Sequence, residues 1–267
     1  MRWSVFAAAR TGETVLDVGC GCGAPTLEFA RAVGRSGHVV GMDISGPMLA
    51  EGAARAKAAD LANVVWRQDD PATAELEGFD LLVSAFGVMF FGDMVGAFTN
   101  MRRAAKPAAR MALVCWRGLA ENPWMELPMK AVAQHLPPRP KGTPNAPGMF
   151  AFANPEYVSE VFTAAGWSPP RFKKFDQDLD IAAGRGLEEA VVQSKQIGAV
   201  NSWAARSAGG DYLRCHPITS RGAGAACGWR LRSSTRRNVV DQQRGILSAI
   251  QARPSHFRPS SVHEVIM

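Results

Sequence analysis

The sequence predicts an α/β fold with a doubly wound, mostly parallel sheet. Within residues 1–116, short apolar runs alternate with amphipathic segments of helical period, which is typical of parallel strands joined by helices. The first apolar run ends in closely spaced glycines, which allow a sharp backbone turn. The composition agrees with a globular chain, because 47% of the 267 residues are hydrophobic and 20% are charged.

The first elements alternate regularly between strand and helix. Residues 14–19 are an apolar run that suits a buried parallel strand. Residues 24–34 have an inward apolar face and end at Gly34, which predicts a helix. Three further segments continue the alternation: a strand at 38–43, an Ala-rich helix at 47–59 and a strand at 63–67. This order predicts parallel neighbours in one sheet.

The same pattern continues to the end of the predicted domain. Residues 79–84 and 110–116 are apolar runs that predict a fourth and a fifth strand, with a helix at 94–105 between them. Three later segments are a helix at 154–166 with Asn154 as its cap, an alternating strand at 172–181 and a helix at 187–200.

Residues 117–153 interrupt the pattern as an insertion after the fifth strand. Seven prolines lie between residues 117 and 150 and leave room for one helix, at 124–135. A loop of this length is usually functional or disordered. We therefore expect residues 1–205 to form one domain that contains this insertion.

The basic charge of the chain is confined to residues 206–267. This tail has 10 Arg and 3 acidic residues, whereas residues 1–205 have 20 basic and 21 acidic ones. Because the body is neutral, the net charge of +6 does not predict a nucleic-acid partner. Two interpretations of the tail stay open: a disordered Arg-rich segment, or translation of a GC-rich gene out of frame. A functional basic arm is a third.

Cysteine usage and hydropathy indicate a reducing compartment and no membrane span. The five Cys are odd in number and unevenly spaced, unlike a disulfide framework. No apolar run approaches the ~20 residues that cross a bilayer, and the first ten residues lack the apolar run of a secretory signal. We expect a cytoplasmic protein. Cys20 and Cys22 have no second ligand pair, so we expect no metal site.

The segment around the first three glycines carries most of the chemical information. Asp17 lies at the end of the first strand, and Gly19, Gly21 and Gly23 follow before the first helix. Glycines there let a ligand approach the backbone, and the helix offers free N–H groups. Asp43, at the end of the second strand, can accept both hydroxyls of a ribose. This is the geometry of nucleotide cofactor sites at the carboxyl ends of parallel strands.

The spacing and the acid favour S-adenosylmethionine over a nicotinamide cofactor. Nicotinamide enzymes usually show G-x-G-x-x-G, which brings a diphosphate to the helix N-terminus. Here the spacing is G-x-G-x-G, and Asp17 precedes it. A carboxylate repels a diphosphate but attracts the ammonium and sulfonium groups of S-adenosylmethionine, which has no phosphate.

On these residues the sequence resembles class I S-adenosylmethionine-dependent methyltransferases, and within them the small-molecule group that includes ubiquinone and menaquinone C-methyltransferases. The resemblance covers residues 12–200 and implies a Rossmann-like methyltransferase fold. We expect the cofactor site to contain residues of the glycine loop and of the ends of the second, third and fourth strands: Asp17, Gly19, Cys20, Gly21, Gly23, Asp43, Ile44, Met48, Asp69, Asp70, Ser84 and Ala85.

The resemblance also implies individual roles for several of these residues. Asp43 corresponds to the family's ribose-binding acid, and Ile44 and Met48 to the apolar positions beside the adenine. Asp70 corresponds to the acid that meets the adenine amino group, and the backbone N–H of Asp69 would face the ring. Ser84 and Ala85, with Phe86, would lie near the methionine end of the cofactor.

The ends of the chain depart from the family pattern. Only about 13 residues precede the first strand, where the family usually has one or more helices. The family's last strand is antiparallel and inserts between the fifth and sixth, but nothing after residue 205 has a strand pattern. We therefore expect this strand to be missing or aberrant, which would leave two strand edges unpaired.

The apolar segment after the fourth strand predicts a wall of the acceptor pocket, formed by Phe86, Met89 and Phe90. Trp116 and Trp124 can add aromatic rings to this wall. Such a wall suits a small apolar or aromatic acceptor. We expect methyl transfer by in-line displacement, with no base identified. The alternatives are a degenerate methyltransferase with weak or no activity and, less favoured, a nicotinamide-dependent oxidoreductase. The sequence does not indicate the oligomeric state.

Overall fold

The computed structural model describes residues 3–133, 138, 142–177 and 260–266. These residues belong to two compact units. The first holds residues 3–118, 143–175 and 262–266, and the second holds, among the described residues, 119–133 with a few short flanking stretches. The predicted helix at 187–200 and most of the Arg-rich tail lie outside the described residues.

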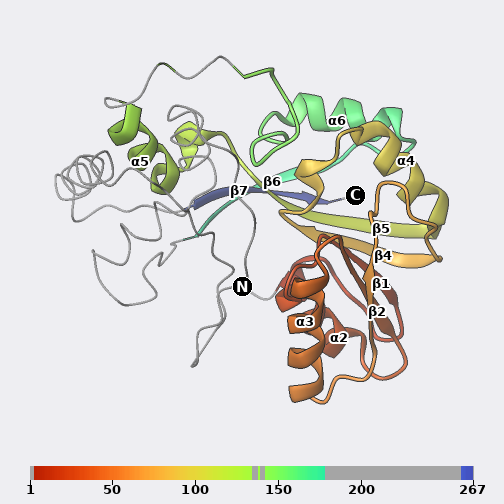
Figure 1. Cartoon of the computed structure of the whole chain (residues 1–267). Coiled ribbons are helices and arrows are strands. Elements are labelled where there is room, and N and C mark those ends of the chain that lie inside the picture. Colours follow the sequence, from red (N-terminus) through yellow and green to blue (C-terminus); the bar gives the residue numbers. More distant parts are fainter. Residues whose placement is uncertain (1–2, 134–137, 139–141, 178–259, 267) are drawn as a thin grey trace. The chain divides into compact units, whose positions relative to one another are not determined.

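The predicted elements of the first unit are confirmed, with ends that shift by a few residues (Figure 1). The strands are β1 Thr14–Val18, β2 His38–Asp43, β3 Val64–Gln68, β4 Phe79–Ala85, β5 Ala105–Trp116 and β6 Arg171–Gln177. The helices are α1 Trp3–Phe6, α2 Ala24–Val33, α3 Gly46–Ala58, α4 Met94–Ala104 and α6 Pro155–Ala164, with a 3-10 turn, η1, at Val88–Phe90. The second unit contains η2 Leu119–Glu121 and α5 Pro123–Ala133.

Helix ends follow the capping signals in the sequence. The Asn154 side chain accepts hydrogen bonds from the N–H groups of Glu156 and Tyr157, at 2.9 and 3.4 Å, and so begins α6. Gly34 ends α2 with a φ of 68°, a conformation that costs glycine little.

The sheet has seven strands in the order β3-β2-β1-β4-β5-β7-β6. The pairs β3–β2, β2–β1, β1–β4 and β4–β5 are parallel, which confirms the doubly wound, mostly parallel fold. The strand β7, Ser260–Ile266, pairs antiparallel with β5, with Leu113 opposite Val265. An antiparallel strand thus lies between β5 and β6, where we expected a missing or aberrant one. His263 and Glu264 interrupt the apolar pattern of this strand, so it has no clear local signal.

Alternate strand residues bury two separate apolar clusters, one on each face of the sheet. The cluster with α1 and α2 contains Val15, Val39, Leu81, Val83 and Ala112. The cluster with α4 and α6 contains Leu16, Val18, Leu82, Met111 and Leu113. Figure 1 shows α2 and α3 flanking the β1–β2 part of the sheet and α4 and α6 beside β5. These layers hold the carboxyl ends of the central strands in place.

Replacing Ala108 by glycine is expected to stabilise the protein. Ala108 has a φ of 61° in a register shift between β4 and β5, a left-handed conformation that a Cβ disfavours. Because Ala108 is exposed, Ala108→Gly should raise the free energy of unfolding by about 1 kcal/mol in urea denaturation. Ala109→Gly is the matched control and should be neutral or destabilising. Equal effects of the two variants would contradict this prediction.

Candidate functional site

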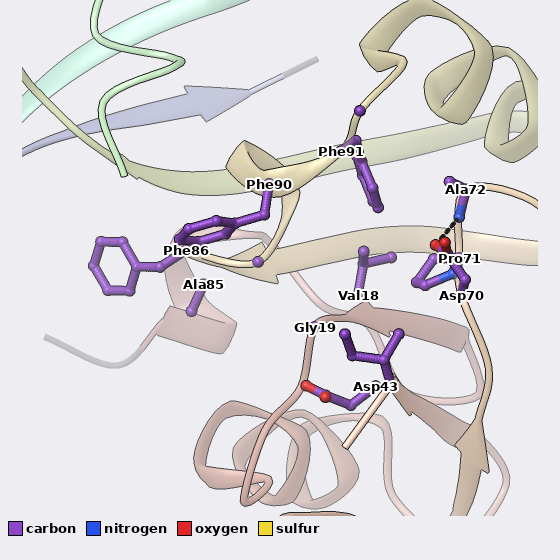
Figure 2. Close-up of a pocket in the computed structure, with 13 residues that line it drawn as sticks. Val18, Gly19, Asp43, Asp70, Pro71, Ala72, Ala85, Phe86, Phe90 and Phe91 are labelled. Carbon is purple, nitrogen blue, oxygen red and sulfur yellow. Dashed lines mark hydrogen bonds between the residues drawn. The ribbon is translucent and has the colours of Figure 1, made fainter. Parts of the chain in front are cut away.

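A pocket of about 390 Å³ lies at the carboxyl ends of β1, β2 and β4 (Figure 2). Val18 and Gly19 line it from β1, Asp43 and Ile44 from β2, and Ala85 from β4. It is therefore at the edge of the sheet where the sequence placed the nucleotide cofactor. Ile44 is 71% exposed, so its side chain is free to cover a bound ring.

The three glycines of the loop after β1 all have left-handed backbone conformations, with φ of 65°, 54° and 76°. A Cβ on Gly19 would lie 2.7 Å from the Cα of Gly87. A Cβ on Gly23 would lie 2.3 Å from the Trp66 ring, and one on Gly21 would lie 3.0 Å from the Met48 side chain. The expectation that these glycines make room for a ligand is thus refined: in each case a protein group fills the space where the Cβ would be.

The end of β4 and the residues that follow it pack closely against this loop. The Ser84 hydroxyl donates to the carbonyl oxygen of Val18 at 2.7 Å and accepts from the N–H of Gly87 at 3.2 Å. Ser84 is fully buried, so it joins the two segments and does not line the pocket. Gly87 does line the pocket, and the sequence analysis missed it. The available signal was a glycine directly after an apolar strand.

Asp43 is held rigidly by backbone donors. One carboxylate oxygen accepts from the N–H of Gly21 at 2.9 Å and the other from the N–H of Ser45 at 2.8 Å. Each carboxylate oxygen has a further lone pair. The side chain is thus oriented beforehand and retains the capacity to accept two ribose hydroxyls.

Asp17 is a buried carboxylate with one oxygen already bonded. Its Oδ2 accepts from the Thr26 hydroxyl at 2.6 Å, while Oδ1 has no hydrogen-bond partner among the described residues. Burial is the main cause that raises the pKa of Asp17 to about 7, and the Asp43 carboxylate adds to it, against the Thr26 hydrogen bond. An unpartnered buried oxygen beside the glycine loop suits a cationic ligand. Asp17 itself does not line the pocket as drawn in Figure 2.

Asp69 and Asp70 follow β3 with different environments. Asp70 lines the pocket, and its carboxylate accepts from the N–H of Ala72 at 2.9 Å (Figure 2). The backbone N–H of Asp69 donates to the Asp43 carbonyl oxygen at 3.2 Å. The prediction that this N–H faces the adenine is therefore wrong, because β3 continues its pairing with β2 for one more residue. The Asp69 carboxylate pairs with Arg67 at 2.8 Å.

Phe86 and Phe90 lie on the side of the pocket away from Asp70 (Figure 2). Phe86 lines the pocket in a left-handed conformation, with φ of 65°, and its ring stacks on Trp116 at 4.4 Å. Phe90 also lines the pocket and is 59% exposed. Met89 does not line it: this side chain is fully buried in the core, which corrects the prediction. Trp124 belongs to the second unit.

Cys20 and Met48, which we expected in the cofactor site, do not line the pocket. Cys20 is buried, and this burial, with the Asp17 and Asp43 carboxylates, raises the pKa of its thiol. Met48 is half-buried against Gly21. Besides Val18 and Gly87, the pocket residues that the sequence did not predict are Pro71, Ala72, Phe91 and Gly92. They lie on irregular segments, where periodicity gives no signal.

Comparison with known families identifies this arrangement. Residues 15–108 match the family model described as "Methyltransferase domain". The chain contains a class I methyltransferase domain. S-adenosylmethionine is the cofactor of this domain, and the orphaned Asp17 oxygen, the oriented Asp43 and the pocket volume fit it. The resemblance inferred from the glycine loop is confirmed.

Curated relatives of the methyltransferase domain act on small molecules according to their names. Nocamycin O-methyltransferase of Saccharothrix syringae is 29% identical over 187 residues, which is 65% of each chain. Demethylmenaquinone methyltransferase of Shouchella clausii is 33% identical over 108 residues, 40% of this chain and 45% of that one. Aklanonic acid methyltransferase of Streptomyces is 36% identical over 104 residues, 38% and 47%. The chain thus spans between about half and two thirds of these relatives' lengths.

Solved structures share the fold. The YcgJ protein from Bacillus has a TM-score of 0.52 at 15% identity, covering 99% of this chain and 94% of that one. Phosphoethanolamine N-methyltransferase 2 of Haemonchus contortus, solved with S-adenosyl-L-methionine, also has a TM-score of 0.52 at 15% identity, covering 100% and 51%. In the described part of this chain, no helix is both long and apolar enough to cross a membrane. No group of three potential metal ligands occurs there either.

Proposed function

We propose that the chain transfers the methyl group of S-adenosylmethionine to a small, uncharged, apolar or aromatic acceptor. The observation that carries the proposal is the Asp17–Asp43 arrangement: a buried carboxylate oxygen to which no described residue donates lies beside the glycine loop, and an oriented acid ends β2. The cofactor carries a cationic amino-acid end and a ribose, which match these two acids in turn.

Each part of the cofactor has a proposed protein partner. The ammonium group would bind Asp17, and the two ribose hydroxyls would donate to Asp43. Ile44 would cover one face of the adenine, and the Asp70 carboxylate would accept from its amino group. The aromatic side of the pocket, with Phe86 and Phe90, is left for the acceptor. The curated relative named for demethylmenaquinone, a quinone, supports this choice of acceptor class.

The protein contributes mainly alignment to the reaction. Bound S-adenosylmethionine would supply an activated methyl group. In-line transfer to the acceptor's nucleophilic atom would break the methyl–sulfur bond and leave S-adenosylhomocysteine, and the proton that the acceptor loses would pass to bulk solvent. Of the described residues that line the pocket, the titratable ones are Asp43 and Asp70, and both are assigned to the cofactor. We therefore assign to Phe86 and Phe90 the task of holding the acceptor and excluding water, without a protein base.

The proposal is tested by calorimetric titration of the purified full chain with S-adenosylhomocysteine. Wild type should bind with micromolar affinity, and Asp43→Ala should weaken binding about 100-fold, because it removes both ribose contacts. Asp80→Ala is the matched control: this acid pairs with Lys106 at the opposite end of β4 and should leave the affinity unchanged. A folded wild type that does not bind would overturn the proposal.

The acceptor class is tested by a second assay. Incubation with S-adenosylmethionine and 1,4-naphthoquinol should release S-adenosylhomocysteine faster than incubation with an aliphatic alcohol of similar size. Phe90→Ala should reduce this preference while leaving the affinity for S-adenosylhomocysteine near that of wild type. Equal rates with both acceptors would contradict the aromatic acceptor and leave the cofactor assignment intact.

A further inference from the structure

One wall of the cofactor pocket has no helix or strand of its own. Residues 69–78 connect β3 to β4 and bring Asp70, Pro71 and Ala72 to the pocket. The segment begins with a turn built on Asp70. Its carbonyl oxygen accepts from the N–H groups of Thr73 and Ala74, at 3.0 and 2.8 Å, and its carboxylate accepts from that of Ala72. The position of the Asp70 carboxylate in the pocket therefore depends on where this turn sits.

The turn is fastened to α4 by the side chain of Asn100. Its amide nitrogen donates to the carbonyl oxygens of Ala74, at 2.8 Å, and Pro71, at 3.3 Å. These two carbonyls flank the turn, and an amide NH₂ group has the two donors that they need. Asn100 itself lies outside the pocket lining.

Helix α4 is a rigid support for this contact. Its N-terminus is capped by Asp93, which accepts from the N–H of Gly96 at 2.9 Å. Phe98 and Met101 are fully buried in the core. Phe98 also contacts the ring of Phe91, which lines the pocket, edge to face at 6.2 Å. The same helix thus supports two walls of the pocket.

We propose that Asn100 is a positioning residue that places the Asp70 wall for recognition of the adenine ring. This inference rests on the proposed function, in which the Asp70 carboxylate accepts from the adenine amino group. Asn100 acts through the turn and touches no cofactor atom. Its loss removes one support of this wall. Among the described residues, Arg67 of β3 still donates to the carbonyl oxygen of Glu75 at 2.6 Å, and Ala74 still packs in the core.

The test measures recognition of the base in addition to affinity. S-adenosylhomocysteine and S-inosylhomocysteine differ at the purine position that carries the amino group in adenine. The dissociation constant of each is measured by calorimetry for wild type, Asn100→Asp and Asn100→Ser. Asn100→Asp has nearly the same shape but no donor, and Asn100→Ser retains one donor on a smaller side chain. Thr99→Val is the matched control, because the Thr99 hydroxyl bonds only within α4, to Val95 at 2.7 Å.

We expect wild type and Thr99→Val to prefer S-adenosylhomocysteine by the same factor. Asn100→Asp should weaken the binding of S-adenosylhomocysteine about 10-fold. It should lower the preference for S-adenosylhomocysteine over S-inosylhomocysteine by a similar factor, and Asn100→Ser should cause a smaller change. A merely structural role would weaken both ligands equally and leave the preference unchanged, which would overturn the inference. Absence of binding to folded wild type would overturn the proposed function and this inference with it.

Discussion

Asp17→Asn is expected to stabilise the cofactor-free protein above pH 7 and to weaken cofactor binding at the same pH. The pKa of Asp17 is raised from 3.8 to about 7 in the folded protein, mainly by burial. The protonated carboxyl therefore contributes stability that is complete below about pH 4 and is lost as the pH rises to about 7. Three pKa units correspond to about 4 kcal/mol.

Urea denaturation of wild type and Asp17→Asn at pH 5 and pH 8 measures this contribution. Wild type should lose stability between the two pH values, whereas the variant, which cannot ionise at this position, should lose much less. The expected gain of the variant at pH 8 is about 2–4 kcal/mol, since its amide also leaves a buried group without a partner. The same pH dependence in both proteins would contradict the prediction.

Cofactor binding should depend on pH in the opposite direction, with an affinity that increases as the pH rises. A cationic ammonium binds the ionised carboxylate, so the affinity of wild type for S-adenosylhomocysteine should rise about 10-fold from pH 6 to pH 8. Asp17→Asn should bind about 100-fold more weakly at pH 8, without this slope. A steep slope that persists in the variant would assign the titration to a different group.

Gly87→Ala is expected to cause a large steric effect at the pocket. The added Cβ would lie 2.6 Å from the Val18 carbonyl oxygen and 2.8 Å from the Cα of Gly19. Both are backbone atoms that cannot rotate away, so the loop after β1 must move. We expect a loss of about 3 kcal/mol in the free energy of unfolding and at least about 10-fold weaker binding of S-adenosylhomocysteine.

The control for this substitution is Gly118→Ala. A Cβ on Gly118 meets nothing within 4 Å, and its backbone is outside the left-handed region. This variant should unfold at the same urea concentration as wild type and bind the ligand equally well. If Gly87→Ala matched wild type in both measurements, the close contact between the segments after β1 and β4 would have no energetic role.

The sequence predicted the first five strands and the helices between them because each has its own local signal. Buried parallel strands are apolar throughout, and amphipathic helices carry one apolar face, as in β2 and α2. The sequence did not predict β7, because Ser260–Ile266 forms a strand through its pairing with β5 and not through a local pattern. His263 and Glu264 interrupt its apolar pattern, and an Arg-rich stretch precedes it.

Sequence position predicted best which residues line the pocket where they lie at or directly after the end of a strand. Gly19, Asp43, Asp70 and Phe86 line the pocket as expected. Met89 was misplaced because a 3-10 turn, η1, rotates it toward the core. The function of Gly87 depends on a contact with a loop far away in the sequence, which spacing alone does not reveal.

The late position of β7 along the chain has a consequence for folding. The strands whose ends line the cofactor pocket all lie within residues 14–85, so their pairing closes shorter loops than the pairing of β5 with β7, which begins at Ser260. β5 cannot acquire its antiparallel neighbour until the chain has been made through Ile266. During synthesis, the nascent chain can therefore assemble a cofactor-binding half while one flank of its sheet stays open to other strands, and docking of β7 is the non-local, slow step.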